Sequence, residues 1–455
     1  TLNLSVRSAL LCPIELPGRQ CDYIIEKTAL QEKERDLSVM SLSKENTQFE
    51  LEILDFAYGG NAFSRLPDGR PVFVPFTMPG ERVRVRVTTA FKDYCTAQLE
   101  EVLKPAPGRV APRCQHFTVC GGCHYQHLPY QQQLEVKQRI VADQLRRIGK
   151  ITAPAVNQII PSADEWQYRS TMQFHISKNG RPGFRAGDGK TVIEVNECYL
   201  PIKGIDKLWP RLDIDAQSGI RRVMLRAGSD SELLAALEGE SNLPPEFNLD
   251  FPLSVHYLSS DRDYLLAGDA HNLMTVNGVN FMVSPRSFFQ VNLGQACKMV
   301  NYVLANVDLN SAVSALDLYS GVGLFSAFLA PRVKELIAVE SSASACDDFA
   351  ANLDFYDNVS LYVGGAEQVL PGLRIAPDLV IVDPPRAGLM FKVVDYLVNS
   401  PVTQLVYVSC DPATLARDCW RLTQGGFTIR SIQPFDFFPQ TYHVECVVFL
   451  DKKRG

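Results

Sequence analysis

The stretch SALDLYSGVGLFSAFLA, residues 314–330, decides the fold of the C-terminal third of the chain. Its apolar start is typical of a buried strand, Gly321 and Gly323 indicate a turn, and the apolar residues after them indicate a helix. A second apolar segment, ELIAVES, indicates another strand that ends at Glu340. Because strands and helices alternate in this way in doubly wound α/β sheets, residues 285–455 are predicted to form a Rossmann-like domain.

The glycine turn also predicts a ligand. Such a turn lets the backbone approach a ligand closely, and an acidic residue about 20 positions later suits two ribose hydroxyls, so Glu340 indicates a nucleoside cofactor. Ser326 stands where a dinucleotide-binding turn carries its third glycine. The missing glycine favours S-adenosylmethionine, which has no pyrophosphate, over NAD.

Two further apolar strands end in residues that can take part in chemistry. VIVDPPRAG places Asp383 directly after one strand, and VYVSCDPATLARD places Cys410 after the next. Open α/β sheets build their sites at the carboxyl ends of strands, so both side chains are predicted to face the cofactor crevice. HVECVVFL places Glu445 in an apolar strand, where a carboxylate is costly without a partner or a function. Inert packing of the thiol and a paired structural carboxylate are the ordinary alternatives.

The N-terminal part of the chain is predicted to contain a small β unit. Short alternating strands separated by turns, from about residue 44 to 104, suggest an OB-like barrel, a fold that often binds oligonucleotides. In GERVRVRVT, Arg82, Arg84 and Arg86 alternate with valines, which places three guanidiniums on one strand face that could follow phosphates. A solvated strand face is the alternative. Residues 1–43 show no clear periodicity and are predicted to be an extension.

A cysteine-rich loop begins the next segment, residues 105–284. CQHFTVCGGC spaces three thiols as C-x5-C-x2-C, and thiolates clustered in this way hold zinc or an iron–sulfur cluster, usually with a fourth ligand. Spacing alone leaves both metals open. The rest of the segment has strand-like pieces and is predicted to be a β-rich middle domain. The candidate ligands are Cys114, Cys120 and Cys123, completed by Cys198 or, for zinc, by His116, His124 or His127.

The length and composition predict a multi-domain cytoplasmic protein. A chain of 455 residues is too long for one core, and 46% hydrophobic with 21% charged residues is ordinary for a globular protein. No apolar run of about 18 residues could span a bilayer, and the start of the chain lacks a secretory signal. Twelve cysteines then suggest free thiols, metal or catalysis before disulfides. We expect a monomer without a membrane partner.

From about residue 43 to its end, the chain resembles the S-adenosylmethionine-dependent RNA uracil-5-methyltransferases, and specifically the branch that acts on 23S ribosomal RNA. The motifs that carry the resemblance occur in the order of that family: CQHFTVCGGCHYQHLPYQQQLEVKQ, FFQVN, DLYSGVG, DPPRAG, SCDPATLARD and HVE. The resemblance implies that the N-terminal barrel is an RNA-binding TRAM domain. It also implies that a [4Fe-4S] cluster is held by Cys114, Cys120, Cys123 and Cys198.

The resemblance further implies roles for residues of the methyltransferase domain. Cys410 matches the nucleophile, Glu445 matches the base, and Phe288 of FFQVN matches an aromatic that is placed against the target base. Leu324 and Asp411 stand where some relatives have asparagine. Gln290 is also a candidate contact to the base, and the cofactor positions fall on Gln290, Tyr319, Gly321, Glu340 and Asp383.

These residues suit methylation at C5 of uridine, because that carbon is too weak a nucleophile to take a methyl group from a sulfonium unaided. A thiolate at Cys410 that adds to C6 would push charge onto C5 and O4, and Glu445 would then remove the C5 proton before the thiol leaves. A base inside a helix or a stacked loop cannot reach the thiol, so the target must be flipped out.

Other functions remain open at the level of the sequence. A tRNA T-loop uridine-5-methyltransferase shares these parts, and a non-catalytic iron–sulfur RNA-binding protein would need only the barrel and the cluster. A cytosine-5-methyltransferase would need Pro-Cys where the chain has Asp383-Pro384-Pro385, and an adenine amino-methyltransferase would need an aromatic residue in place of Arg386. The last two fit the sequence poorly.

Overall fold

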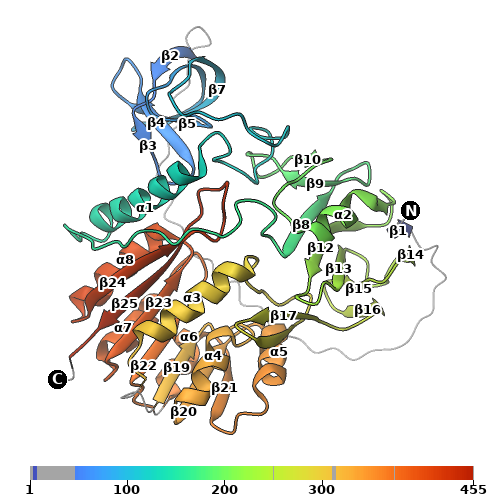
Figure 1. Cartoon of the computed structure of the whole chain (residues 1–455), viewed down its shortest axis with the longest axis vertical. Helices are drawn as coiled ribbons and strands as arrows, with labels where there is room; N and C mark the ends of the chain where they lie inside the picture. Colours follow the sequence, from blue (N-terminus) through green and yellow to red (C-terminus); the bar gives the residue numbers. More distant parts are fainter. Residues whose placement is uncertain (1–3, 8–46, 250, 310–313, 374, 454–455) are drawn as a thin grey trace. The chain divides into compact units, whose positions relative to one another are not determined.

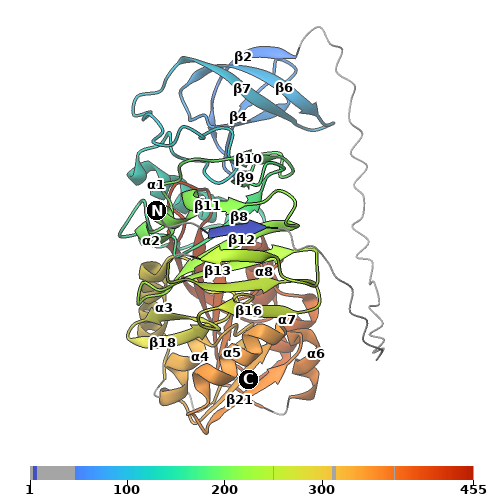
Figure 2. The same ribbon diagram turned by 90° about the vertical axis from the view of Figure 1, so that its right-hand side faces the viewer.

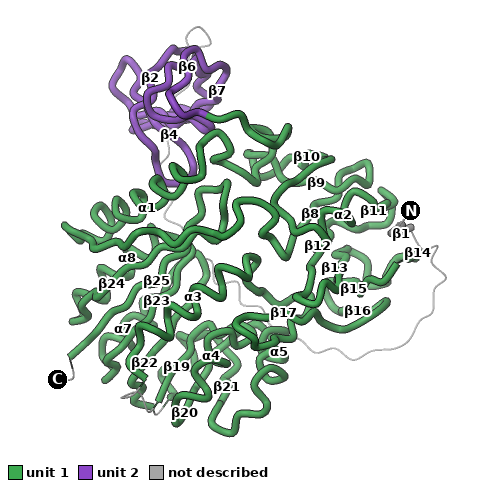
Figure 3. The backbone as a smooth tube through the Cα atoms, in the orientation of Figure 1, with its two compact units in different colours: residues 1–6, 110–455 green, residues 7–109 purple. Residues whose placement is uncertain are grey.

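The chain forms two compact units in the computed structural model (Figure 3). Residues 7–109 form one unit, and residues 1–6 with 110–455 form the other. Most of the expected extension, residues 1–43, lies outside the described residues, although it includes one described strand, β1 (Leu4–Arg7). The structure describes residues 4–7, 47–249, 251–309, 314–373 and 375–453.

The smaller unit is built around a six-stranded sheet. Its strand order is β2-β6-β7-β5-β4-β3. Val83, Val85 and Val87 of β6 are buried, because alternate side chains of a strand point to the same face. The alternation in RVRVRV therefore fixes which face of β6 packs on the core. The strands are β2 (Gln48–Glu52), β3 (Asp55–Phe56), β4 (Asn61–Arg65), β5 (Pro71–Pro75), β6 (Arg82–Ala90) and β7 (Cys95–Lys104).

The other face of β6 carries the three arginines that the alternation predicted, and each of them binds a carboxylate of a neighbouring strand. Glutamates of β2 and β7 supply these carboxylates, so positive and negative side chains share the face. The arginines alone therefore do not make this face a strongly positive surface for phosphates. The pairs are Arg82–Glu50, Arg84–Glu50, Arg84–Glu101 and Arg86–Glu100.

The larger unit begins with the cysteine-rich loop and α1 (Tyr130–Arg147), followed by a β-rich region. The main sheet of this region has the order β10-β9-β8-β12-β13-β15-β16. Trp209 stacks on Phe174 of β8 and anchors the segment that follows α2 (Lys203–Leu208). The strands are β8 (Thr171–Ile176), β9 (Pro182–Arg185), β10 (Val192–Glu194), β11 (Leu212–Ile214), β12 (Ile220–Ala227), β13 (Leu233–Gly239), β14 (Glu246–Leu249), β15 (Ser254–Leu258) and β16 (Asp263–Ala267).

A hairpin of β17 (Asn272–Val276) and β18 (Val279–Val283) leads into the C-terminal sheet, which has the order β21-β20-β19-β22-β23-β25-β24. The first five strands are parallel, and β25 runs antiparallel to both of its neighbours. The strands are β19 (Ser314–Leu318), β20 (Glu335–Glu340), β21 (Val359–Val363), β22 (Leu379–Val382), β23 (Gln404–Ser409), β24 (Thr428–Phe435) and β25 (Glu445–Asp451).

Helices cover both faces of this sheet, which explains the continuous apolar run in β19 (Figures 1 and 2). Leu316 and Leu318 pack in a core with residues of α7 and α8, whereas Ala315 packs with residues of α3 and α4. None of the described helices is long and apolar enough to cross a membrane. The helices are α3 (Leu293–Asn306), α4 (Leu324–Leu329), α5 (Ala343–Leu353), α6 (Ala366–Val369), α7 (Phe391–Asn399) and α8 (Pro412–Gln424).

Candidate active site

The glycine turn after β19 is held against β20. Tyr319 has a positive φ of 62°, which is uncommon for a residue with a side chain, and its N–H donates to the carbonyl oxygen of Val339 at 2.9 Å. The N–H of Gly321 donates to Glu340 Oε2 at 2.9 Å, and the N–H of Ser341 donates to Glu340 Oε1 at 2.7 Å. Tyr319, Gly321 and Glu340 were predicted to bind the cofactor. They therefore lie together at the carboxyl ends of β19 and β20.

The two glycines of this turn have different roles. A Cβ added at Gly321 would meet no atom of the described residues within 4 Å, so the turn borders open space among them. Gly323 has a φ of 93°, and a Cβ there would lie 2.4 Å from Leu353 Cδ1. Gly323 thus allows α4 to pack on α5, while the space beside Gly321 is where a nucleoside could approach the backbone.

Asp383, Cys410 and Glu445 come from three strands of this sheet. Asp383 follows β22 and Cys410 follows β23, and these two strands are parallel neighbours. β25 runs antiparallel to β23 with Ser409 opposite Cys446, so Glu445, at the start of β25, lies across from Cys410. The register of the sheet therefore brings the predicted nucleophile and the predicted base to the same end of the sheet, next to Asp383.

Burial changes the proton affinity of all three groups. Burial, and after it the charge of Asp383, raises the pKa of Glu445 to about 8. Burial together with Asp317 raises the pKa of Asp383 to about 7. Burial, Glu445 and Asp383 raise the pKa of Cys410 to about 12. The raised pKa values of Cys410 and Glu445 favour the protonated forms of both groups at neutral pH.

Arg386 is a candidate that the sequence analysis left out of the site. Its guanidinium opposes the rise in the pKa of Cys410 and of Glu445, and it adds to the effect of burial that lowers the pKa of His443 to about 3. A cation that acts on both a thiol and a carboxyl group favours their ionised forms. The signal was present in the motif DPPRAG, but Arg386 served there only to argue against an adenine methyltransferase.

Phe288 and Gln290 lie on the loop between β18 and α3. The Phe288 side chain is 71% exposed, whereas Gln290 is buried. Arg226 of β12 is itself buried and fixes the loop, because its guanidinium donates to the carbonyl oxygens of Ser284 at 3.0 Å and of Ser287 at 2.8 Å. An exposed aromatic ring on a fixed backbone is suited to stack on a base. Nothing in the sequence around Arg226 indicated this contact.

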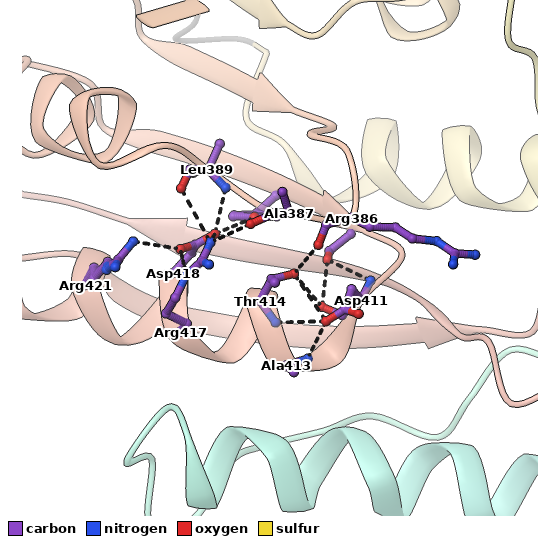
Figure 4. A network of polar contacts seen from close by, with 11 residues as sticks. Arg386, Ala387, Leu389, Asp411, Ala413, Thr414, Arg417, Asp418 and Arg421 are labelled. Carbon is purple, nitrogen blue, oxygen red and sulfur yellow. Dashed lines mark hydrogen bonds and ion pairs between the residues drawn. The ribbon is translucent and has the colours of Figure 1, made fainter. Parts of the chain in front are cut away.

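The loops that carry Asp383 and Cys410 are tied to each other through α8 (Figure 4). The Asp411 carboxylate caps α8 and accepts the N–H of Thr414 at 2.9 Å. The hydroxyl of Thr414 in turn donates to the carbonyl oxygen of Arg386 at 3.0 Å. Aspartate caps a helix as well as asparagine does, so the departure at Asp411 preserves this connection.

The cysteines predicted as metal ligands line one cavity of about 280 Å³. Among the described residues, no group of three or more His, Cys, Asp or Glu side chains is arranged to hold a metal ion. Two of the histidines considered for zinc have other partners. His116 hydrogen-bonds to Asn196 at 2.8 Å, and the ring of His124 packs edge-on against Tyr442. The thiols in the cavity wall are those of Cys114, Cys120, Cys123 and Cys198.

The cysteine-rich loop and α1 also contact the segment that leads into β25. The N–H groups of His124 and Tyr125 donate to the carbonyl oxygen of Gln440 at 2.8 and 3.0 Å. Lys137 of α1 is fully buried and pairs with Asp436 at 2.6 Å. The cysteine-rich loop and α1 therefore fix the segment between β24 and β25, which leads to the predicted base.

Two family models match the chain. The model described as tRNA (Uracil-5-)-methyltransferase matches residues 373–453, which contain Asp383, Cys410 and Glu445. The TRAM domain model matches residues 42–99. Both matches agree with the order of motifs in the sequence.

Relatives cover nearly the whole chain. A protein from Halalkalibacterium halodurans, described as an uncharacterized RNA methyltransferase, is 31% identical over 450 residues, covering 90% of this chain and 98% of the relative. A protein from Nostoc sp. with the same description is 32% identical over 440 residues, covering 88% of this chain and 95% of the relative.

A solved structure also matches most of the fold. Pyrococcus abyssi tRNA (uracil-54, C5)-methyltransferase, in complex with S-adenosyl-L-homocysteine, is similar with a TM-score of 0.68 and 26% identity, covering 89% of this chain and 100% of that chain. The predicted fold class, an α/β methyltransferase fold with an N-terminal TRAM barrel and a β-rich middle region, is confirmed. The chain therefore belongs to the RNA uracil-5-methyltransferase family.

Proposed function

We propose that this protein transfers a methyl group from S-adenosylmethionine to C5 of a specific uridine in 23S ribosomal RNA. The observation that carries the proposal is the placement of Cys410 and Glu445 across from each other on β23 and β25, at the end of the sheet where the glycine turn of β19 lies. The resemblance of the ordered motifs to the 23S branch supports the choice of RNA. A tRNA T-loop uridine is the second candidate, because the similar Pyrococcus abyssi protein is a tRNA (uracil-54, C5)-methyltransferase.

The cofactor would occupy the space beside the glycine turn. Gly321 leaves that space open, and Tyr319, Glu340 and Asp383 border it from the ends of β19, β20 and β22. Gln290 makes no hydrogen bond to another described residue, so its amide is available to a ligand. When bound, S-adenosylmethionine supplies the methyl group as an electrophilic sulfonium.

The chemistry on the RNA side belongs to two residues. Cys410 reacts in its thiolate form, which the charge of Arg386 favours against the effect of burial. The thiolate forms a bond to C6 of the uracil ring, and the electron pair of the C5–C6 double bond moves toward C5 and O4. C5 then gains the methyl group, after which the Glu445 carboxylate accepts the C5 proton. The electron pair of the C5–H bond restores the double bond as the C6–sulfur bond breaks and the thiolate leaves. Arg386 favours the ionised forms of both residues through its charge.

The cavity lined by four thiols is proposed to hold a [4Fe-4S] cluster. Its volume of about 280 Å³ has room for a group of several atoms, whereas a single tetrahedral ion needs its ligands drawn together at bonds of about 2.3 Å. Four thiolates are also the usual ligand set of such a cluster. Protein purified without oxygen should contain iron and sulfide and absorb broadly in the visible. Stoichiometric zinc without sulfide would contradict the assignment. We also place the enzyme in the cytoplasm, where cysteines stay reduced, and expect it to act as a monomer.

The reaction and its RNA are tested by one experiment. Total RNA from a strain that lacks the gene is incubated with the purified protein and S-adenosylmethionine, and new 5-methyluridine positions are mapped. A site in 23S ribosomal RNA is expected. A new site only in tRNA would select the second candidate, and binding of RNA without any methylation would leave a non-catalytic iron–sulfur protein.

A further inference from the structure

An exposed platform spans the loop that connects β22 to α7 and the first turn of α7. Met390, at the end of the loop, is 52% exposed, and Phe391, the first residue of α7, is 69% exposed. Arg386 of the loop and Lys392 of α7 are exposed cations. No acidic residue lies between Arg386 and Lys392. We call residues 386–392 the α7 platform. Its apolar surface is in contact with water unless a partner covers it.

The platform is a fixed structure, because α8 holds its backbone (Figure 4). Asp418 of α8 is fully buried and accepts the N–H of Leu389 at 2.8 Å and the hydroxyl of Tyr407 at 2.9 Å. Arg417 pairs with Asp418 at 2.8 Å and donates to the carbonyl oxygen of Ala387 at 2.8 Å. The backbone of the loop is thus held on both sides of its turn. Its exposed side chains need no further ordering of the backbone when a partner binds.

Gly388 makes this arrangement possible. It has a φ of 74°, and a Cβ at this position would lie 2.4 Å from Asp418 Oδ2 and 2.6 Å from Arg417 Nη2. The guanidinium of Arg421, also on α8, lies 5.9 Å from the centre of the Phe391 ring. The ring of Phe391 is therefore held beside a cation while most of its surface remains exposed.

The platform is continuous with the proposed active site. Asp383 and Arg386 belong to the same loop, and the charge of Arg386 acts on Cys410 and Glu445. A uridine that is flipped out to reach Cys410 leaves its neighbours in the strand without a stacking partner. From Arg386 the platform runs along α8, past Asp418, to Phe391 beside Arg421. Phe391 therefore lies farther along α8 from Cys410 than Arg386 does, where its exposed ring suits a base of the strand that leads away from the flipped uridine.

We propose that the α7 platform is a second RNA contact, on which a nucleotide that flanks the target uridine stacks against Phe391 while Lys392 faces the RNA backbone. The inference rests on the proposed function, because it names the part of the enzyme that binds the flanking RNA. The platform supplies binding, and the methyl-transfer step itself remains with Cys410 and Glu445.

Phe391→Ala tests the platform, and Phe355→Ala is its matched control. Phe355 is 71% exposed in the same unit, but it precedes β21 and so lies at the opposite end of the parallel strands. With a short RNA that contains the mapped uridine, Phe391→Ala should raise KM and the Kd of the RNA about ten-fold, the loss expected for one stacked base. The rate at saturating RNA should stay near the wild-type value. Phe391→Tyr should restore affinity, and Phe355→Ala should change nothing.

Abasic sites in the RNA show whether the contact is direct. Removing the one base that stacks on Phe391 should weaken binding to the wild-type protein but not to Phe391→Ala, whereas abasic sites elsewhere should affect both proteins equally. Equal affinity of Phe391→Ala and wild type, or losses that do not depend on any flanking base, would overturn the proposal and leave the platform to a protein partner. The Kd of the RNA tests the platform even if no methyl group is transferred. Failure of the proposed function would instead appear as wild-type protein that methylates no RNA.

Discussion

Glu445→Gln probes the proposed base through stability as well as through catalysis. The carboxyl group of Glu445 is buried at the start of β25, and its pKa rises from an ordinary value of 4.5 to about 8. This rise corresponds to about 5 kcal/mol of preference for the protonated form in the folded protein. Because the folded pKa lies above the unfolded one, the associated stability is fully present below pH 4.5 and is lost as the pH rises through 8.

Glutamine has nearly the same shape and cannot ionise, so Glu445→Gln avoids this loss. At pH 5 the variant and the wild type should be about equally stable. At pH 9 the variant should be more stable by up to about 5 kcal/mol, and about 3 kcal/mol is expected because water and side-chain movement relieve part of the cost. For a domain the size of residues 285–455, a gain of about 3 kcal/mol corresponds to a rise in Tm of about 10 °C. Thermal unfolding without oxygen at both pH values measures this rise.

The same substitution should also stop the reaction at one step. Attack by Cys410 and methyl transfer need no base at C5, so Glu445→Gln should stay covalently bound to methylated RNA and give a slowly migrating band on a denaturing gel. If the stability difference between Glu445→Gln and the wild type were the same at pH 5 and pH 9, burial would not raise the pKa of Glu445. If it turned over near the wild-type rate without an adduct, Glu445 would not be the base.

Three further substitutions separate the other parts of the site. Cys410→Ala should abolish methylation and give no RNA adduct, because C6 is never attacked, and any adduct on the gel used for Glu445→Gln would exclude Cys410 as the nucleophile. Arg226→Met removes the hydrogen bonds to two loop carbonyl oxygens, so Phe288 should lose its fixed position. KM for RNA should rise at least several-fold, with a smaller change in the rate at saturating RNA. An unchanged KM would contradict this role. Cys198→Ser should lower the iron content of anaerobically purified protein, and full retention of iron and sulfide would remove Cys198 from the ligand set.

Local patterns predicted where the glycine turn and Glu340 lie in the sheet. The residues around the glycine turn after β19 and around the acidic residue that ends β20 are enough to predict both features. Parallel strands then bring their carboxyl ends to the same side of the sheet. The structure brings the glycine turn and Glu340 together, and it adds a hydrogen bond from the N–H of Gly321 to Glu340 that the sequence did not predict. The positions of Asp383 and Cys410 follow from the same rule.

Contacts between distant segments could not be predicted in this way. Arg226 occurs in an ordinary strand of the middle region, and only the folded chain brings it under the loop of Phe288. Lys137 is one basic residue of a polar helix, yet it is buried against Asp436. The stripe of arginines on β6 was visible in the sequence, but the glutamates that balance it come from other strands. Alternation fixes a face, whereas the charge of that face depends on the neighbours that the fold supplies.

Three buried carboxyl groups at one end of the sheet fit the charge of the proposed cofactor. Asp317, Asp383 and Glu445 bring three carboxyl groups with raised pKa values to one end of the sheet, and burial is the main cause in each case. Buried carboxyl groups destabilise a fold unless an opposite charge compensates them. S-adenosylmethionine carries a sulfonium cation, whereas the product S-adenosylhomocysteine carries none. The carboxyl groups should therefore favour the methyl donor over the product, because a nearby sulfonium charge offsets part of the cost of ionising a buried carboxyl group.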